Sequence, residues 1–164
     1  MAVYTTIDKP SAHFEVDIYA GSSGTTTITG IGFQPDLIIT KNRTEDESIW
    51  NVTDSTRGNT KNFSTDNTTA EDTTTRIASF TSDGLTLTGG VEETNTASDY
   101  FVQYLWKANG GTTSSNTDGS ITSTVQANTT AGFSIVTYTG TGSAATIGHG
   151  LGVAPKMILV KKRS

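Results

Sequence analysis

The sequence contains no cysteine among its 164 residues. A disulfide framework, a thiolate metal site and a cysteine nucleophile are therefore excluded. No apolar run approaches the roughly 20 residues that a membrane-spanning helix needs. The first residues, 1–4, also lack the charged-then-apolar order of a secretion signal. We therefore expect no membrane partner and, if the protein acts outside a cell, a route other than ordinary secretion.

Positive charge is scarce as well. Eleven Lys and Arg against sixteen Asp and Glu give a net charge of −5, so the clustered basic surface that nucleic acids require is not expected. Apolar residues make up only 33% of the chain, whereas threonine occurs 33 times. Threonine is β-branched and suits the solvated faces of strands. Because charge is low and the apolar residues fall in patterned runs, the composition favours a folded β protein over disorder.

Short apolar segments separated by Gly, Asn and Asp turns fill the chain, and helical periodicity does not extend beyond a turn. From Phe14 to Tyr19 apolar and polar residues alternate, which predicts one buried and one wet face. Residues 37–40 and 100–106 are expected to be strands covered on both faces. Other strands are predicted at 25–28, 48–52, 76–80, 85–87, 121–125, 133–139, 146–147 and 156–160. The pattern predicts an all-β, antiparallel β-sandwich or jelly-roll-like module.

The end of the chain repeats its beginning. Phe14 aligns with Phe133 at a separation of 119 residues, and after one insertion near His149, Pro35 aligns with Pro155 at 120. A fixed period indicates tandem modules. We divide the chain into a lead-in (1–11), a sandwich module (12–109), a Gly/Thr/Ser/Asn-rich linker with a short strand (110–130) and a partial second repeat (131–164).

Two hypotheses follow from the partial repeat. Either the chain belongs to a longer polypeptide, or the partial copy is a complete part that lies beside the first module or a neighbouring subunit. Unpaired strand edges would otherwise be exposed, and such edges invite the addition of a strand. A natural mass near 17.3 kDa would contradict the first hypothesis.

Five motifs follow one another along the chain: Phe33–Arg43, Asp54–Gly58, Phe80–Leu85, Tyr104–Gly111 and the run from Gly132 to Pro155. These motifs and their order resemble a recurring repeat in virion proteins of marine bacteriophages, including phages of cyanobacteria. The resemblance covers nearly the whole chain. It implies a structural virion protein, such as a fibre, a tail appendage or a capsid decoration, and it supplies no catalytic residues.

The two histidines are the candidates for a catalytic base. His13 abuts the first strand and His149 lies in a Gly-rich loop, and neither has a G-x-S-x-G serine turn nearby. The glycines of 148–152 lack a following Lys-Ser/Thr and a helix, so phosphate-loop and dinucleotide sites are not predicted. We predict no catalytic residues and no enzyme.

Acidic residues gather in predicted loops. A glycosidase would need two of them held across a cleft, and solvated loop charge is the simpler interpretation. Oxygen ligands suit calcium, but the spacing matches no calcium loop, so we predict no metal and no cofactor. A calcium-induced shift in melting temperature would contradict this. The acids considered are Glu45, Asp46, Glu47, Glu71, Asp72, Glu92 and Glu93, with Asp54, Asp66 and Asp83.

Four aromatic residues are able to stack on sugars if exposed: Trp50, Tyr100, Tyr104 and Trp106. With so few large apolar residues in the chain, we expect them in the core instead, and a glycan site would then use the loops 51–70 and 92–99.

Three functions remain as hypotheses. The preferred one is a non-enzymatic structural part of a virion that assembles by homo-oligomerisation with itself and other virion proteins. The second is a carbohydrate-binding, host-recognition module, which glycan-array binding would favour. The third is a glycan hydrolase, which would release reducing sugar ends, and we expect no such release.

Overall fold

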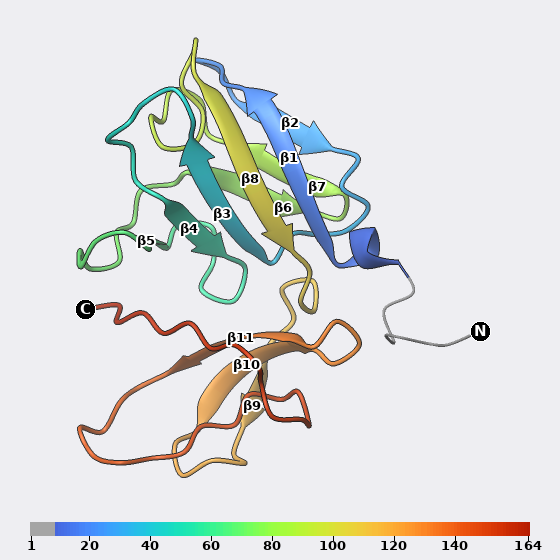
Figure 1. The fold of residues 1–164 in the computed structure, drawn as a ribbon, viewed down its shortest axis with the longest axis vertical. Helices are drawn as coiled ribbons and strands as arrows, with labels where there is room; N and C mark the ends of the chain where they lie inside the picture. Colours follow the sequence, from blue (N-terminus) through green and yellow to red (C-terminus); the bar gives the residue numbers. More distant parts are fainter. Residues whose placement is uncertain (1–8) are drawn as a thin grey trace.

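A computed structural model describes residues 9–164, and the prediction for residues 1–4 lies outside this range. The fold is all-β with three antiparallel sheets and no closed barrel (Figure 1). A five-stranded sheet has the order β1-β8-β3-β4-β5, a three-stranded sheet the order β2-β7-β6, and a second three-stranded sheet the order β11-β10-β9. The strands are β1 (Phe14–Ala20), β2 (Thr26–Thr29), β3 (Leu37–Asn42), β4 (Asn51–Asp54), β5 (Asn62–Ser64), β6 (Ile77–Thr81), β7 (Gly84–Leu87), β8 (Tyr100–Trp106), β9 (Ser114–Asn116), β10 (Ser123–Asn128) and β11 (Phe133–Tyr138).

The predicted all-β antiparallel class is therefore confirmed. A short 3-10 turn, Pro10–Ala12, precedes β1. Within residues 9–164, no helix is long and apolar enough to cross a membrane. The five-stranded sheet and the β2-β7-β6 sheet lie face to face as a sandwich, and the β11-β10-β9 sheet lies beyond one end of it (Figure 1).

The core lies between the two sheets of the sandwich. β8 shows how it is built, because Phe101, Gln103 and Leu105 point inward with no exposed surface and the residues between them point outward. Burying one leucine or phenylalanine side chain contributes about 1.5–3 kcal/mol. The packed core cluster consists of Ile28, Ile31, Phe33, Ile38, Ile77, Leu85, Leu87 and Leu105.

Strand β1 has the predicted two-residue alternation, but its apolar side faces away from the core. Phe14, Val16 and Ile18 are 36%, 40% and 63% exposed. Tyr19, on the inward side, stacks on Phe101 at 5.2 Å and donates its hydroxyl to the carbonyl of Thr94. β1 pairs with β8 along its length, and Tyr19 is its residue that packs against the core cluster, while its most apolar residues remain accessible.

The second repeat is realised only in part. β11 forms where the first strand was predicted and pairs antiparallel with β10, as β1 pairs with β8. Of the predicted strand 146–147, a single parallel bridge between Ile121 and Ile147 is present. The predicted strand 156–160 is wrong, because within the described residues no strand pairs with it. Its counterpart β3 is paired on both sides, with β8 and with β4.

Two short strands were not predicted. β5 lies inside the polar stretch 51–70, and β9 lies inside the predicted linker 110–130, which also contains β10. Both are polar three-residue segments that pair with a longer neighbour, β4 and β10 respectively.

Candidate functional site

The outward surface of the five-stranded sheet carries a continuous row of apolar side chains across all five strands. Residues opposite each other in adjacent strands share a face, so the strand register places one residue of every strand in this row. We call this surface the outer face. The row consists of Val16, Tyr104, Ile39, Val52 and Phe63.

Aromatic rings also cross the outer face. The ring centroids of Trp50 and Tyr104 are 6.3 Å apart, and those of Tyr104 and Trp106 are 6.5 Å apart. The ring of Trp106 also lies beside those of Phe14 and Phe133, at centroid distances of 4.9 Å and 6.3 Å. The expectation that these tryptophans and tyrosines fill the core is wrong. They lie outside it, because the inward positions of β8 hold other residues.

One end of the outer face is sealed by Arg57. Its guanidinium lies 4.3 Å from the centroid of the Phe63 ring, a cation–π geometry. The same group forms ion pairs with Asp54 at 2.5 Å and Glu71 at 2.7 Å. Beneath this cover Val52 is only 2% exposed. Because its charge is paired twice, the arginine is able to remain buried over apolar surface.

The other end of the outer face is bare. Phe14, Val16, Ile18 and Tyr100 lie on the adjacent strands β1 and β8, and each is at least 36% exposed, with Ile18 at 63% and Tyr100 at 58%. We call these four residues the bare patch. Their side chains supply apolar area for contact with another molecule, and the Tyr100 phenol is the one polar side-chain group among them.

Most of the predicted acidic candidates are already bound within the chain. Asp54 and Glu71 pair with Arg57, and Glu71 also pairs with Arg163. Burial disfavours ionisation of Glu71, but hydrogen bonds from Arg163 and Arg57 outweigh it and hold its pKa below the ordinary value. Asp72 and Glu93 hold the two ends of the Arg76 guanidinium.

The remaining acids do not converge either. Asp83 accepts the backbone N–H groups of Gly30 and Gly32, which lowers its pKa, and Asp66 accepts from Trp50. The loop acids 45–47 are exposed. Across the described part of the chain, no three acids or histidines come together in a geometry that would hold a metal ion.

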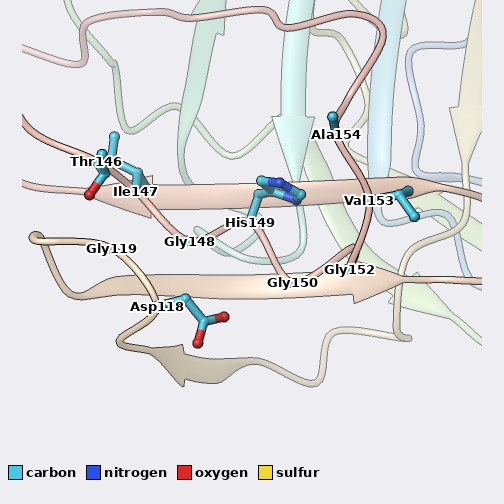
Figure 2. Close-up of a pocket in the computed structure, with 10 residues that line it drawn as sticks. All are labelled: Asp118, Gly119, Thr146, Ile147, Gly148, His149, Gly150, Gly152, Val153 and Ala154. Carbon is cyan, nitrogen blue, oxygen red and sulfur yellow. The ribbon is translucent and has the colours of Figure 1, made fainter.

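The two histidines lie apart and both have structural contacts. His13 lies within 3.3 Å of the Asn128 side chain, at the contact between the sandwich and the small sheet. His149 accepts the backbone N–H of Leu151 through Nδ1. It lines a shallow pocket of about 500 Å³ with Asp118 and several glycines (Figure 2). Figure 2 shows the ring and the carboxylate on separate segments, and the Asp118 carboxylate is bonded to Asn116.

Sequence reasoning missed the most heavily bonded carboxylate, that of Asp36. It is fully buried and accepts the backbone N–H groups of Ala108 at 2.7 Å, Gly110 at 2.9 Å and Gly111 at 2.9 Å. The hydroxyl of Ser55 donates to it at 2.7 Å. Asp36 therefore shapes the turn by which the chain leaves β8.

Gln126 of β10 completes this junction. Its Oε1 accepts the N–H groups of Asn109 and Gly111, and its Nε2 donates to Ser55 and Thr56. The side chain is fully buried. The small sheet is consequently bound to the sandwich through a network of polar hydrogen bonds. No short sequence motif predicts this network.

The fold and its surface define an all-β sandwich protein with a small attached sheet and an apolar outer face. The chain belongs to the family described as a domain of unknown function, DUF7483, whose model matches residues 9–164. No curated protein and no solved structure matches the chain.

Proposed function

We propose that this protein is a non-enzymatic structural component of a phage virion that assembles by homo-oligomerisation. The observation that carries the proposal is the bare patch, Phe14, Val16, Ile18 and Tyr100. Apolar surface of this kind on an otherwise polar, threonine-rich chain is typical of an interaction site.

The orientation of the two faces of β1 relative to the core strengthens this argument. A strand with a two-residue pattern normally turns its apolar side toward the core, because slipping by one residue exchanges the two faces. β1 instead turns Glu15 and Asp17 inward and its apolar side outward. Full burial of a valine, isoleucine or phenylalanine contributes about 1.5–3 kcal/mol. A protein partner over the patch would therefore recover a few kcal/mol that the single chain forgoes.

The virion assignment is supported by the resemblance of motifs such as Phe33–Arg43 and Tyr104–Gly111 to the repeat of marine phage proteins. The lack of catalysis is supported by the separate positions of His13 and His149 and by the internal pairing of acids such as Glu71. Each of these groups has a structural partner that accounts for its position.

Two measurements test the proposal. Sedimentation velocity of the purified 164-residue chain should show oligomers that grow with concentration, and a monomer throughout the micromolar range would refute self-association. Gold-labelled antibody against the chain should mark intact particles of the phage that encodes it. Purified particles without label would refute the virion assignment.

A carbohydrate-binding module for host recognition is the second candidate, and the aromatic row of the outer face favours it. Trp50, Tyr104 and Trp106 are only partly covered, and their rings follow each other at 6.3 and 6.5 Å. Glycan-array binding that Trp106→Ala abolishes would support this function. Binding unchanged by Trp106→Ala would exclude the row as the site.

A further inference from the structure

A run of four apolar residues, Met157–Val160, is exposed along its whole length. The exposed fractions are 74%, 70%, 74% and 74%, so neither side of the segment is covered. Within the described range, none of the four takes part in a hydrogen bond, either through its backbone or through its side chain. We call this run the exposed segment.

The sequence of the exposed segment is that of a central strand. By the internal repeat it corresponds to Leu37–Thr40 of β3, which is hydrogen-bonded to β8 on one side and to β4 on the other. An extended segment with unpaired N–H and C=O groups and branched apolar side chains is suited to join the edge of another sheet.

The exposed segment is held in place at its far end. The Arg163 guanidinium grips the Glu71 carboxylate through two hydrogen bonds of 2.8 and 2.9 Å. The N–H of Glu71 donates to the carbonyl of Arg163 at 2.9 Å, and Lys161 donates to the carbonyl of Asn67 at 2.7 Å. These contacts fix one end of the exposed segment on the surface of its own chain. The segment therefore loses less conformational entropy when it binds a partner.

An acceptor edge lies on β1. One backbone hydrogen bond lies just beyond each end of the β1–β8 ladder. The N–H of Gly21 donates to the carbonyl of Asp99, and the N–H of Lys107 donates to the carbonyl of His13. Because alternate residues bond across an antiparallel pair, the odd-numbered residues of β1 face β8. The even-numbered ones direct their N–H and C=O groups to the open edge. The Val16 N–H confirms this, since it is bonded only by the adjacent Glu15 carboxylate at 3.1 Å.

The two elements have complementary charge. Glu15 and Asp17 lie on the same side of β1, and neither forms an ion pair within residues 9–164. Burial, with a smaller contribution from the nearby Glu15 charge, raises the pKa of Asp17. The exposed segment is followed directly by Lys161 and Lys162. Lys161 already donates to the carbonyl of Asn67. Since neighbouring residues of a strand point to opposite faces, Lys162 meets the acidic side in the register that directs it there.

The donor and the acceptor lie at opposite ends of the sheet. β1 is one edge of the five-stranded sheet and β5 is the other. Beyond β5, Asn62 bonds to Asp72, and the adjacent Glu71 bonds to Arg163. At about 4.8 Å per strand, four spacings separate β1 from β5 by about 19 Å. In Figure 1 the chain end marked C lies on the β5 side, away from β1.

We propose that the exposed segment of one copy adds as a strand to the open edge of β1 in a second copy. This inference rests on the proposed self-association and specifies which surfaces of the two copies are in contact. The added strand continues the outer face beyond β1 and lays its side chains next to Val16 and Ile18 of the bare patch. Donor and acceptor are different surfaces, so the contact is head-to-tail and generates a closed ring or an open filament.

The donor side is tested with the substitutions Ile158→Asp and Val160→Asp made together. Both residues are 70% or more exposed, so the fold should persist. Sedimentation velocity should show the loss of the wild-type oligomers. Val153→Asp is the matched control, because Val153 is 68% exposed but lies outside the segment. It should assemble as the wild type does.

The acceptor side is tested with Glu15→Lys and Asp17→Lys made together. A second variant, Val16→Pro, removes an N–H of the open edge and leaves the β8 ladder its donors. Each acceptor variant should be monomeric. When the donor and acceptor variants are mixed, one intact donor meets one intact acceptor, so assembly should stop at a pair.

The outcomes separate the two proposals. If the wild type assembles and the donor and acceptor variants assemble equally well, the strand contact is refuted and self-association stands. A wild type that remains monomeric refutes both. Mixtures that grow beyond two chains would refute the head-to-tail arrangement.

Discussion

The substitution Asp36→Asn tests whether one buried carboxylate joins the sandwich to the chain that follows it. Asp36 Oδ2 accepts the N–H groups of Ala108 and Gly110, and Oδ1 accepts those of Gly111 and the hydroxyl of Ser55. Asparagine has the same shape but only one acceptor oxygen. Its amide group must therefore face N–H or O–H donors on one side.

The cost follows from the number of donors left without a partner. If the asparagine oxygen replaces Oδ1, the N–H groups of Ala108 and Gly110 lose their acceptor. Ala108 is 3% exposed, whereas Gly110 is exposed and water is able to replace the lost bond there. An unsatisfied buried donor costs about 1–3 kcal/mol, so the single buried donor of Ala108 sets an expected loss of about 1–3 kcal/mol. This is a substantial share of the total stability of a folded domain, which is about 5–15 kcal/mol.

Urea unfolding followed by tryptophan fluorescence measures this loss. With a slope of about 2 kcal/mol per molar urea, a loss of about 2 kcal/mol lowers the midpoint by roughly 1 M. Asp83→Asn is the matched control. Asp83 also accepts two backbone N–H groups, but it is exposed, so water replaces them and the midpoint should move much less. Equal midpoints for the two variants would refute the reasoning.

Three further outcomes are expected. Leu105→Ala should lower the free energy of unfolding by about 2–5 kcal/mol in urea titrations, whereas Ile18→Ala, on the outward side of β1, should change it little in the monomer. Lowering the pH from about 5 to about 3 should destabilise the wild type more than Glu71→Gln. The Glu71 pKa is depressed in the folded state, so its contribution is present above the ordinary pKa of 4.5 and is lost as pH falls through the folded-state pKa. Glu71→Gln should also release Arg163 and speed tryptic cleavage after Lys161, as mass spectrometry would record; an unchanged cleavage rate would contradict the anchoring contact.

The fold was predictable where local pattern and tertiary environment agree. β8 has the predicted bounds, Tyr100–Trp106, because its dense apolar run has strand neighbours on both sides. The face of β1 was not predictable, since alternation fixes two faces but not which of them meets the core. β5 and β9 are polar segments whose extended form comes from pairing with a neighbour, and this pairing leaves no apolar period in the sequence.

The candidate site was predictable only in its residue types. Trp50, Tyr104 and Trp106 stood out as aromatics, but their place on the outer face depends on the register of four strand pairs. The role of Asp36 was not predictable, because the N–H groups that donate to its carboxylate are 72 to 75 residues away in the sequence. Contacts of this separation follow from the fold and are not encoded in a local motif.

The two copies of the repeat differ at the residue that precedes their apolar strand. Asp36 precedes β3 and accepts the N–H groups of the turn after β8, which locks that strand beside its neighbour. Lys156 stands at the matching position before the exposed segment. An ammonium group donates and does not accept hydrogen bonds, so it is unable to hold such a turn. The same apolar strand sequence is paired on both sides at its first occurrence and exposed without a partner strand at its second, which is the condition that pairing with another copy requires.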